Sequence, residues 1–248
     1  MTVKKKKKVV AKKKVAVKKK VSSTKKKVSK KKAHITKNYL MMVLDESGSM
    51  ASMKLQAISA FNEQIETVKK NRGTLDVSVG LVKFSSTVQD VYTNVAIDSA
   101  ESLTLESYNP GGGTAMYDGV GHAIENLLAQ SDINDENVNV LMLIISDGEE
   151  NSSRKYTSAS VGEKIQELQK TKRWTFTYAG ANQDLSKIQT ALNIPAGNTM
   201  LFAASAAGMK SANATRSLGT QAFYSTTLNA GAGAVNSFYS DVETKAKS

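Results

Sequence analysis

Two uninterrupted apolar runs, Tyr39–Leu44 and Val140–Ile145, constrain the fold of this chain more than any other feature. A strand with one face in water alternates apolar and polar residues, whereas a strand covered on both faces is apolar throughout. Strands of the second kind belong to parallel sheets with helices packed above and below them. The two runs therefore predict central strands of an α/β domain.

Other segments alternate between strand-like and helix-like patterns. Strands are expected at 75–84, 88–92, 175–179 and 199–202, and helices at 50–70, 116–130, 157–171, 184–192, 206–226 and 232–245. The short segment 88–92 follows closely on 75–84, which favours a hairpin. The order predicts a doubly wound, mostly parallel sheet with helices on both faces and one antiparallel edge strand.

The net charge of +12 hides two regions of opposite sign. Residues 1–33 hold 17 lysines and no acidic residue, whereas the remaining 215 residues carry 17 basic and 22 acidic side chains. Like charges repel, and the few small apolar spacers cannot offset chain entropy, so this segment is expected to be disordered when free. We expect a tail at 1–36, a domain at 37–204 and a helical extension at 205–248, packed on the domain or trailing it.

The lysine-rich tail is expected to bind the backbone of DNA or RNA. Each phosphate that a lysine neutralises releases counterions, which makes such binding strong at low salt. The tail lacks arginine and aromatic residues, so it should not read sequence. Another polyanion, an acidic protein surface, a lipid head group or a purely solubilising role remains an alternative. The expected contact residues are Lys4, Lys5, Lys6, Lys7, Lys8, Lys12, Lys13, Lys14, Lys18, Lys19, Lys20, Lys25, Lys26, Lys27, Lys30, Lys31 and Lys32.

Composition narrows the classes of site and of protein to which the chain could belong. The chain has no cysteine, which excludes disulfides, zinc–thiolate sites and thiol nucleophiles. No apolar run approaches the roughly 18 residues of a membrane span, and no apolar segment of a signal peptide follows the basic start. We therefore expect a soluble, cytoplasmic protein.

Polar oxygen ligands follow the expected strands and loops at three places. Asp45, Ser47 and Ser49 come directly after the first apolar run, Thr114 ends a Gly-rich loop, and Asp147 follows the second run. In open α/β sheets, sites form beyond the carboxyl ends of the strands. Carboxylates and hydroxyls suit Mg²⁺, Mn²⁺ or Ca²⁺. A cation held by only two carboxylates is expected to recruit an acidic ligand from outside.

The pattern Asp45-x-Ser47-x-Ser49, a later Gly-Gly-Thr114 and a strand ending in Ser-Asp147-Gly resemble the metal-ion-dependent adhesion site of von Willebrand factor A domains. The resemblance covers roughly 38–203. It implies that these five residues hold a divalent cation, most often Mg²⁺. It also implies that a carboxylate of a protein partner fills the open coordination position.

Two further stretches, Ala179–Asp184 and Ala203–Gly208, resemble bacterial and phage members of the same family. Such domains often accompany AAA+ ATPases of the MoxR type, so the resemblance implies that class of partner. Glu46, Asp118, Asn182 and Gln183 are expected on the rim that a partner would touch.

Several residues have simpler alternative roles. Ser49 could cap the following helix, Asp118 could begin or cap the helix at 116–130, and Asp184 could cap the helix at 184–192. Glu149, Glu150 and Asn151 are expected in a solvated loop, with selection of partners as an alternative role, and Trp174 is expected in the core. The glycines 111–113 lack the lysine of a phosphate-binding loop. His34 and His122 form no pair.

Three hypotheses of function follow. The first is a metal-dependent protein-binding module held on nucleic acid by its tail. The second is a nucleic-acid-associated architectural protein in which the folded domain only assembles. The third, a metal-dependent hydrolase, is disfavoured because Glu46 is the only candidate general base and the Gly-x-Ser-x-Gly nucleophile pattern is absent. The chain is therefore not expected to be an enzyme.

Overall fold

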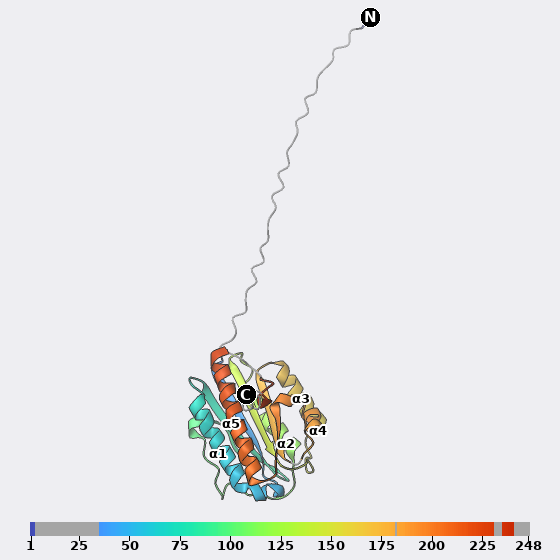
Figure 1. The fold of residues 1–248 in the computed structure, drawn as a ribbon. Helices are drawn as coiled ribbons and strands as arrows, with labels where there is room; N and C mark the ends of the chain where they lie inside the picture. Colours follow the sequence, from blue (N-terminus) through green and yellow to red (C-terminus); the bar gives the residue numbers. More distant parts are fainter. Residues whose placement is uncertain (3–34, 182, 231–234, 241–248) are drawn as a thin grey trace. The chain divides into compact units, whose positions relative to one another are not determined.

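The computed structural model describes residues 1–2, 35–181, 183–230 and 235–240. The lysine residues of the tail and Asn182 lie outside the described residues. In the described part a single six-stranded sheet has the order β3-β2-β1-β4-β5-β6 (Figure 1). The strands are β1 (Lys37–Asp45), β2 (Asp76–Phe84), β3 (Val88–Ala96), β4 (Val138–Ser146), β5 (Trp174–Ala181) and β6 (Thr199–Phe202).

The sheet is parallel except at one edge. β1 pairs in parallel with both β2 and β4, and β5 and β6 extend the parallel sheet beyond β4. β3 pairs antiparallel with β2, which confirms the predicted hairpin. Every residue of β4 is buried, as the apolar run predicts. Because Leu44 pairs with Ile145, the residues that follow these two strands emerge side by side.

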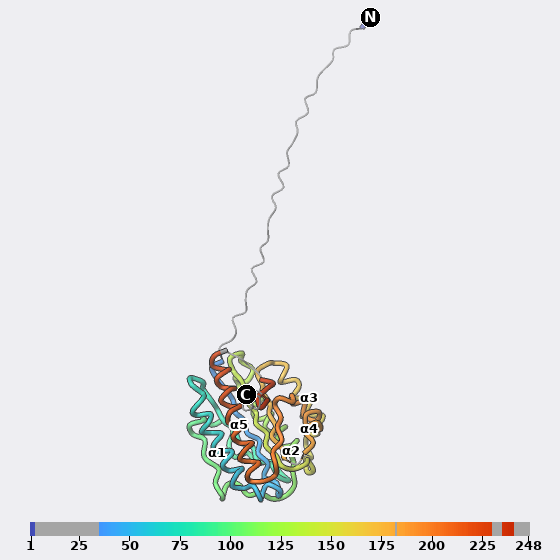
Figure 2. The backbone as a smooth tube through the Cα atoms, viewed as in Figure 1, coloured from blue at the N-terminus to red at the C-terminus, as the bar shows by residue number. Residues whose placement is uncertain are grey.

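Helices cover both faces of the sheet, as Figure 1 shows and as the backbone trace in Figure 2 lets the reader follow. α1 and α5 pack on one face, where Leu40, Met42 and Leu44 of β1 join one hydrophobic cluster. α2, α3 and α4 pack on the other face. The helices are α1 (Lys54–Asn71), α2 (Met116–Leu128), α3 (Ser158–Lys170), α4 (Leu185–Leu192) and α5 (Ala206–Ala230).

The predicted helices differ from the observed ones in two places. The helix expected at 50–70 begins with a 3-10 segment, Gly48–Met53, whose Met50 and Met53 are fully buried. The helix expected at 232–245 falls partly outside the described residues. Its described part, 235–240, passes through a turn to Ser240, which is helical, and buries Phe238 and Tyr239. This segment is held on the domain by Asn198, whose amide donates hydrogen bonds both to the Phe176 carbonyl in β5 and to the Val235 carbonyl.

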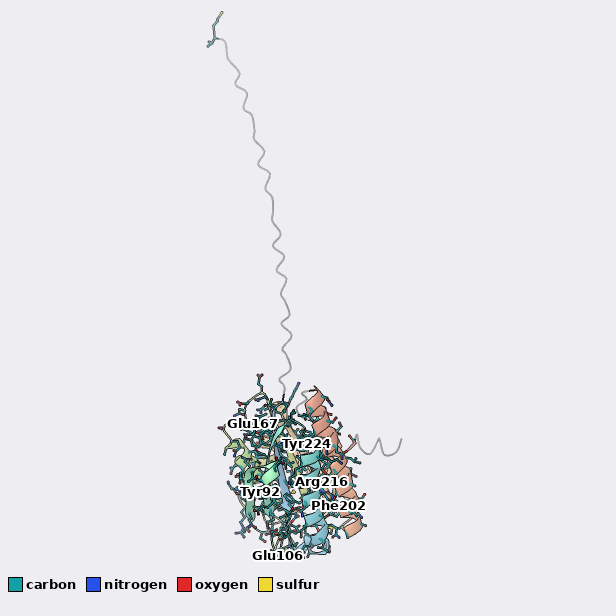
Figure 3. All side chains as sticks on the ribbon, turned by 90° about the vertical axis from the view of Figure 1, so that its left-hand side faces the viewer. Tyr92, Glu106, Glu167, Phe202, Arg216 and Tyr224 are labelled. Carbon is teal, nitrogen blue, oxygen red and sulfur yellow. The ribbon has the colours of Figure 1, made fainter. Side chains whose placement is uncertain are left out.

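α5 belongs to the core of the domain. Arg216 and Tyr224, labelled in Figure 3, come from this helix and are fully buried. The Tyr224 hydroxyl donates a hydrogen bond of 2.6 Å to Asn38 Oδ1 in β1. Among the described helices, none combines the length and apolarity that a membrane crossing requires.

Candidate functional site

Three segments meet beyond the carboxyl ends of β1 and β4. The backbone N–H of Glu46 donates to the Phe84 carbonyl at the end of β2. The loop after β1 is joined to the Gly-rich loop by two further backbone hydrogen bonds, Gly48 to Gly112 at 3.1 Å and Gly111 to Glu46 at 2.8 Å. The topology therefore brings the three predicted ligand-bearing segments to one edge of the sheet.

Asp45 lies at the base of this site and is fully buried. One carboxylate oxygen accepts a hydrogen bond of 2.7 Å from the Ser47 backbone N–H, and the other accepts one of 2.6 Å from the Ser146 hydroxyl. Burial raises the pKa of Asp45 to about 6, although the hydrogen bonds from Ser146 and Ser47 oppose the shift. The carboxylate is oriented before any ligand arrives.

Ser47, Ser49 and Asp147 form a hydrogen-bonded chain above Asp45. The two serine hydroxyls are 3.1 Å apart, and the Ser49 hydroxyl donates to Asp147 Oδ1 at 2.6 Å. Burial raises the pKa of Asp147, and the hydrogen bond from Ser49 opposes that shift. Serine oxygens and a carboxylate from segments 98 positions apart are thus within direct contact.

Gly148 leaves room among these oxygens. A Cβ atom at this position would lie 2.9 Å from Thr114 Oγ1, 3.4 Å from Ser49 Oγ and 3.8 Å from Ser47 Oγ. The three hydroxyls therefore face one small volume that any side chain at this position would enter. Thr114 is held there because its backbone N–H donates to Asn151 Oδ1 at 2.9 Å.

The donor set consists of oxygen atoms only. Two carboxylates and three hydroxyls are ligands that hard divalent cations prefer, whereas zinc and copper favour histidine and cysteine. The described residues contain no group of three or more His, Cys, Asp or Glu side chains that could hold a metal. A cation at this site would therefore depend on the serine and threonine hydroxyls as well as on Asp45 and Asp147.

Glu46 does not lie on the rim where it was expected. Its carboxylate accepts a hydrogen bond of 2.8 Å from Lys83 Nζ, and the side chains are only 12% and 5% exposed, respectively. The same oxygen accepts a hydrogen bond of 2.5 Å from the Asn109 backbone N–H. Glu46 is a buried support that joins the loop after β1 to β2 and to the Gly-rich loop.

Asp118 lies in the first turn of α2, which agrees with its alternative role at the start of this helix, and its carboxylate turns to the loop after β4. Its carboxylate accepts hydrogen bonds from three consecutive backbone N–H groups, those of Arg154, Lys155 and Tyr156, at 2.8 to 2.9 Å. Burial raises the pKa of Asp118, but these hydrogen bonds outweigh it and the net shift is downward. Asp118 fixes the loop between β4 and α3.

The structure also places four other residues for which the sequence suggested a role. Gln183 lies beside the site, where its amide donates to the Gly148 carbonyl and its oxygen accepts from the Tyr178 hydroxyl. Asp184 caps α4 by accepting a hydrogen bond of 3.0 Å from the Ser186 backbone N–H. Ser49 makes no cap, since its hydroxyl is directed to Asp147. Trp174 is buried as predicted.

Sequence reasoning missed four supporting residues. Ser146 orients Asp45, and the Tyr108 hydroxyl donates a hydrogen bond of 2.5 Å to the Asp45 carbonyl. Glu150 and Asn151, expected in a solvated loop, accept hydrogen bonds from backbone N–H groups: Glu150 from Tyr117, Ser152 and Ser153, and Asn151 from Thr114. For Glu150 and Asn151, the sequence offered one indication: a carboxylate and an amide follow closely after Ser146-Asp147-Gly148.

Comparison with known proteins decides the family. The sequence profile of the von Willebrand factor type A domain matches residues 40–215, a span that contains all five candidate ligands. The chain belongs to this family. A search of curated proteins found no match to the chain.

Solved structures with this von Willebrand factor A fold share little sequence with the chain. A von Willebrand factor type A protein from Catenulispora acidiphila is 17% identical, with a TM-score of 0.52 over 75% of this chain and 43% of that one. The pilus adhesin SpaC from Lactobacillus rhamnosus GG is 12% identical, with a TM-score of 0.55 over 78% of this chain and 31% of that one. This chain thus spans less than half of either protein, and the likeness shows the fold alone.

Proposed function

We propose that this von Willebrand factor A domain binds a divalent cation, Mg²⁺ in the first place, and through it a carboxylate of a protein partner. Asp45, Ser47, Ser49, Thr114 and Asp147 would hold the cation. The observation that carries the proposal is the volume beside Gly148, which three hydroxyls face. Family membership supports a role in protein interaction, because such domains typically act as interaction modules.

The chain's own residues account for an open ligand position. Mg²⁺ usually keeps ligand positions that the protein does not fill, so a cation held by these side chains would remain open to an oxygen atom of a partner. Ser146 and the Ser47 backbone N–H orient the Asp45 carboxylate, and Asn151 positions Thr114. A bound cation would supply positive charge that attracts a partner's carboxylate.

A binding role fits the surroundings better than hydrolysis does. Glu46 is the only candidate general base that the sequence offers, and its carboxylate is buried, with one oxygen accepting from both Lys83 and the Asn109 backbone N–H. A general base needs a lone pair within reach of the attacking water. We therefore propose that the chain is not an enzyme.

Divalent-dependent stabilisation tests the proposal directly. With Mg²⁺ at one hundred times its dissociation constant, binding to the folded state should add about 2.7 kcal/mol of stability. Asp45→Ala should remove the Mg²⁺-dependent rise in melting temperature. Asp98→Ala is the matched control, because Asp98 is exposed, pairs with Arg72 and contacts none of the candidate ligands. Identical melting temperatures of the unmodified protein in Mg²⁺ and in EDTA would exclude the cation site.

We also propose that residues 1–33 hold the domain on nucleic acid through backbone contacts. The supporting observation is the contrast between 17 lysines without an acid in this segment and the acidic excess elsewhere. Eight phosphate contacts would give a slope near −7 in a plot of log affinity against log salt on duplex DNA. Deleting residues 1–33 should abolish DNA binding in gel shifts. Unchanged affinity after the deletion would exclude a tail-driven mechanism.

A further inference from the structure

An open cleft lies next to the candidate metal site, on the side of the β2–β3 turn. It has a volume of about 420 Å³ and is lined by the turn, by the first half of α2 and by the loop after β4. Its lining side chains are mostly polar or charged. The lining residues are Ser86, Thr87, Val88, Asp118, His122, Arg154, Lys155 and Tyr156.

The cleft and the candidate metal site share a wall. The Gly113 backbone N–H donates a hydrogen bond of 2.8 Å to Ser86 Oγ, and the next residue along the chain is Thr114. The Ser86 and Thr114 hydroxyls are separated by this hydrogen bond and by the backbone from Gly113 to Thr114. They therefore lie within about 9 Å of each other. A single extended peptide segment can therefore reach both places.

The guanidinium of Arg154, which lines the cleft, is available to bind a ligand. Its side chain is exposed, and within the described residues no hydrogen bond or ion pair engages its guanidinium. The other charged lining groups have partners: Lys155 pairs with Glu125, His122 with Asp90, and Asp118 with three backbone N–H groups. Those three hydrogen bonds fix the backbone that carries Arg154, so its side chain extends from a fixed point in the wall of the cleft.

We infer that this cleft is a second subsite for an acidic side chain of the same partner, bound through Arg154. The inference rests on the proposed function, since the first carboxylate is the one held at the cation. An extended segment advances about 3.3 to 3.6 Å per residue, so roughly three residues cover the span of about 9 Å between the Ser86 and Thr114 hydroxyls. We therefore place the second acidic residue two to four positions from the first. The planar guanidinium matches a carboxylate with two parallel hydrogen bonds. The partner is thus a peptide segment with two acidic residues at close spacing.

Peptide selection on the full chain tests this specificity. A random 12-residue phage-displayed library is panned in Mg²⁺, and bound clones are released with EDTA, which leaves behind clones held only by the lysine-rich segment. Clones from the unmodified protein should carry a pair of acidic residues two to four positions apart. Clones from Arg154→Gln should carry a single acidic residue. Lys170→Gln, an exposed lysine at the far end of α3, controls for the loss of one positive charge.

A titration by fluorescence polarisation then measures how much the peptide's second acidic residue contributes to affinity through Arg154. One selected peptide is compared with the version in which its second acid is changed to the amide. The acid should improve affinity about fivefold with the unmodified protein and less than twofold with Arg154→Gln. An unchanged ratio in Arg154→Gln would overturn the second subsite while leaving the cation site intact. Failure to recover any EDTA-released clone would overturn the proposed function and this inference together.

Discussion

Replacing Lys83 with methionine should destabilise the domain by about 3 kcal/mol, because the change leaves a buried carboxylate without its cation. The Lys83 ammonium lies 2.8 Å from Glu46 Oε1, and their side chains are 5% and 12% exposed. After the change, the Glu46 carboxylate would retain the Asn109 backbone N–H, a single donor for a buried charge. The Ser107 carbonyl would lose the hydrogen bond of 2.7 Å that Lys83 donates.

Equilibrium unfolding provides the assay. Trp174 is the sole tryptophan and is buried, so its fluorescence reports the core during urea unfolding. A loss of 3 kcal/mol should lower the melting temperature by roughly 6 to 12 °C in a domain of this size. Measurements are made in EDTA, because a bound cation would add its own stabilisation.

Two comparisons isolate the ion pair. Lys164→Met disrupts the exposed pair of Lys164 with Glu167 and should change stability by no more than about 0.5 kcal/mol. Combining Lys83→Met with Glu46→Gln removes both charges and should recover most of the lost stability. A loss below about 1 kcal/mol in Lys83→Met, or a double variant no more stable than the single one, would refute the buried-charge argument.

Three further changes probe the site and its supports. Gly148→Ala should abolish the Mg²⁺-dependent rise in melting temperature while circular dichroism remains unchanged, because the new Cβ stands 2.9 Å from Thr114 Oγ1. Tyr108→Phe should cost about 1 kcal/mol in urea unfolding by removing the donor to the Asp45 carbonyl. The pKa of Asp118 is lowered, so its charge stabilises the fold above the unfolded pKa of about 3.9 and this contribution fades as pH falls through the folded value. The stability difference between the unmodified protein and Asp118→Ala should therefore shrink as pH falls below about 4, and a constant difference would contradict this.

The fold could be predicted largely from local patterns. The two apolar runs predict β1 and β4, and burial of both faces follows from the absence of polar residues in them. The C-terminal part was harder, because α5 is rich in Ala, Ser and Thr and carries the buried Arg216, which no pattern marks as part of the core. Packing of α5 on α1 arises from contacts between distant segments that periodicity does not encode.

The supports of the candidate site were less predictable than its proposed ligands. Asp45 and Asp147 follow strands, and topology alone brings the ends of adjacent parallel strands together. Ser146 and Tyr108 act through hydrogen bonds to Asp45 across 101 and 63 positions of sequence, and such pairings depend on loop conformation. From sequence alone, a serine at the end of a strand or a tyrosine in a loop could serve in many ways, so nothing marks Ser146 or Tyr108 as a support of Asp45.

Glu46 is different, because its place between Asp45 and Ser47 at the end of a strand predicts its orientation. Side chains point to opposite sides at successive positions of an extended segment. Ser47 has the extended angles φ −68° and ψ 167°, so the neighbouring Glu46 turns away from the side that Ser47 faces. The side that Glu46 faces holds β2 and Lys83, which is why its carboxylate is buried in an ion pair and not exposed on the rim. The pattern that directs Ser47 toward the proposed cation site therefore also turns Glu46 away from it, and one loop provides both a proposed ligand and the residue that supports the loop.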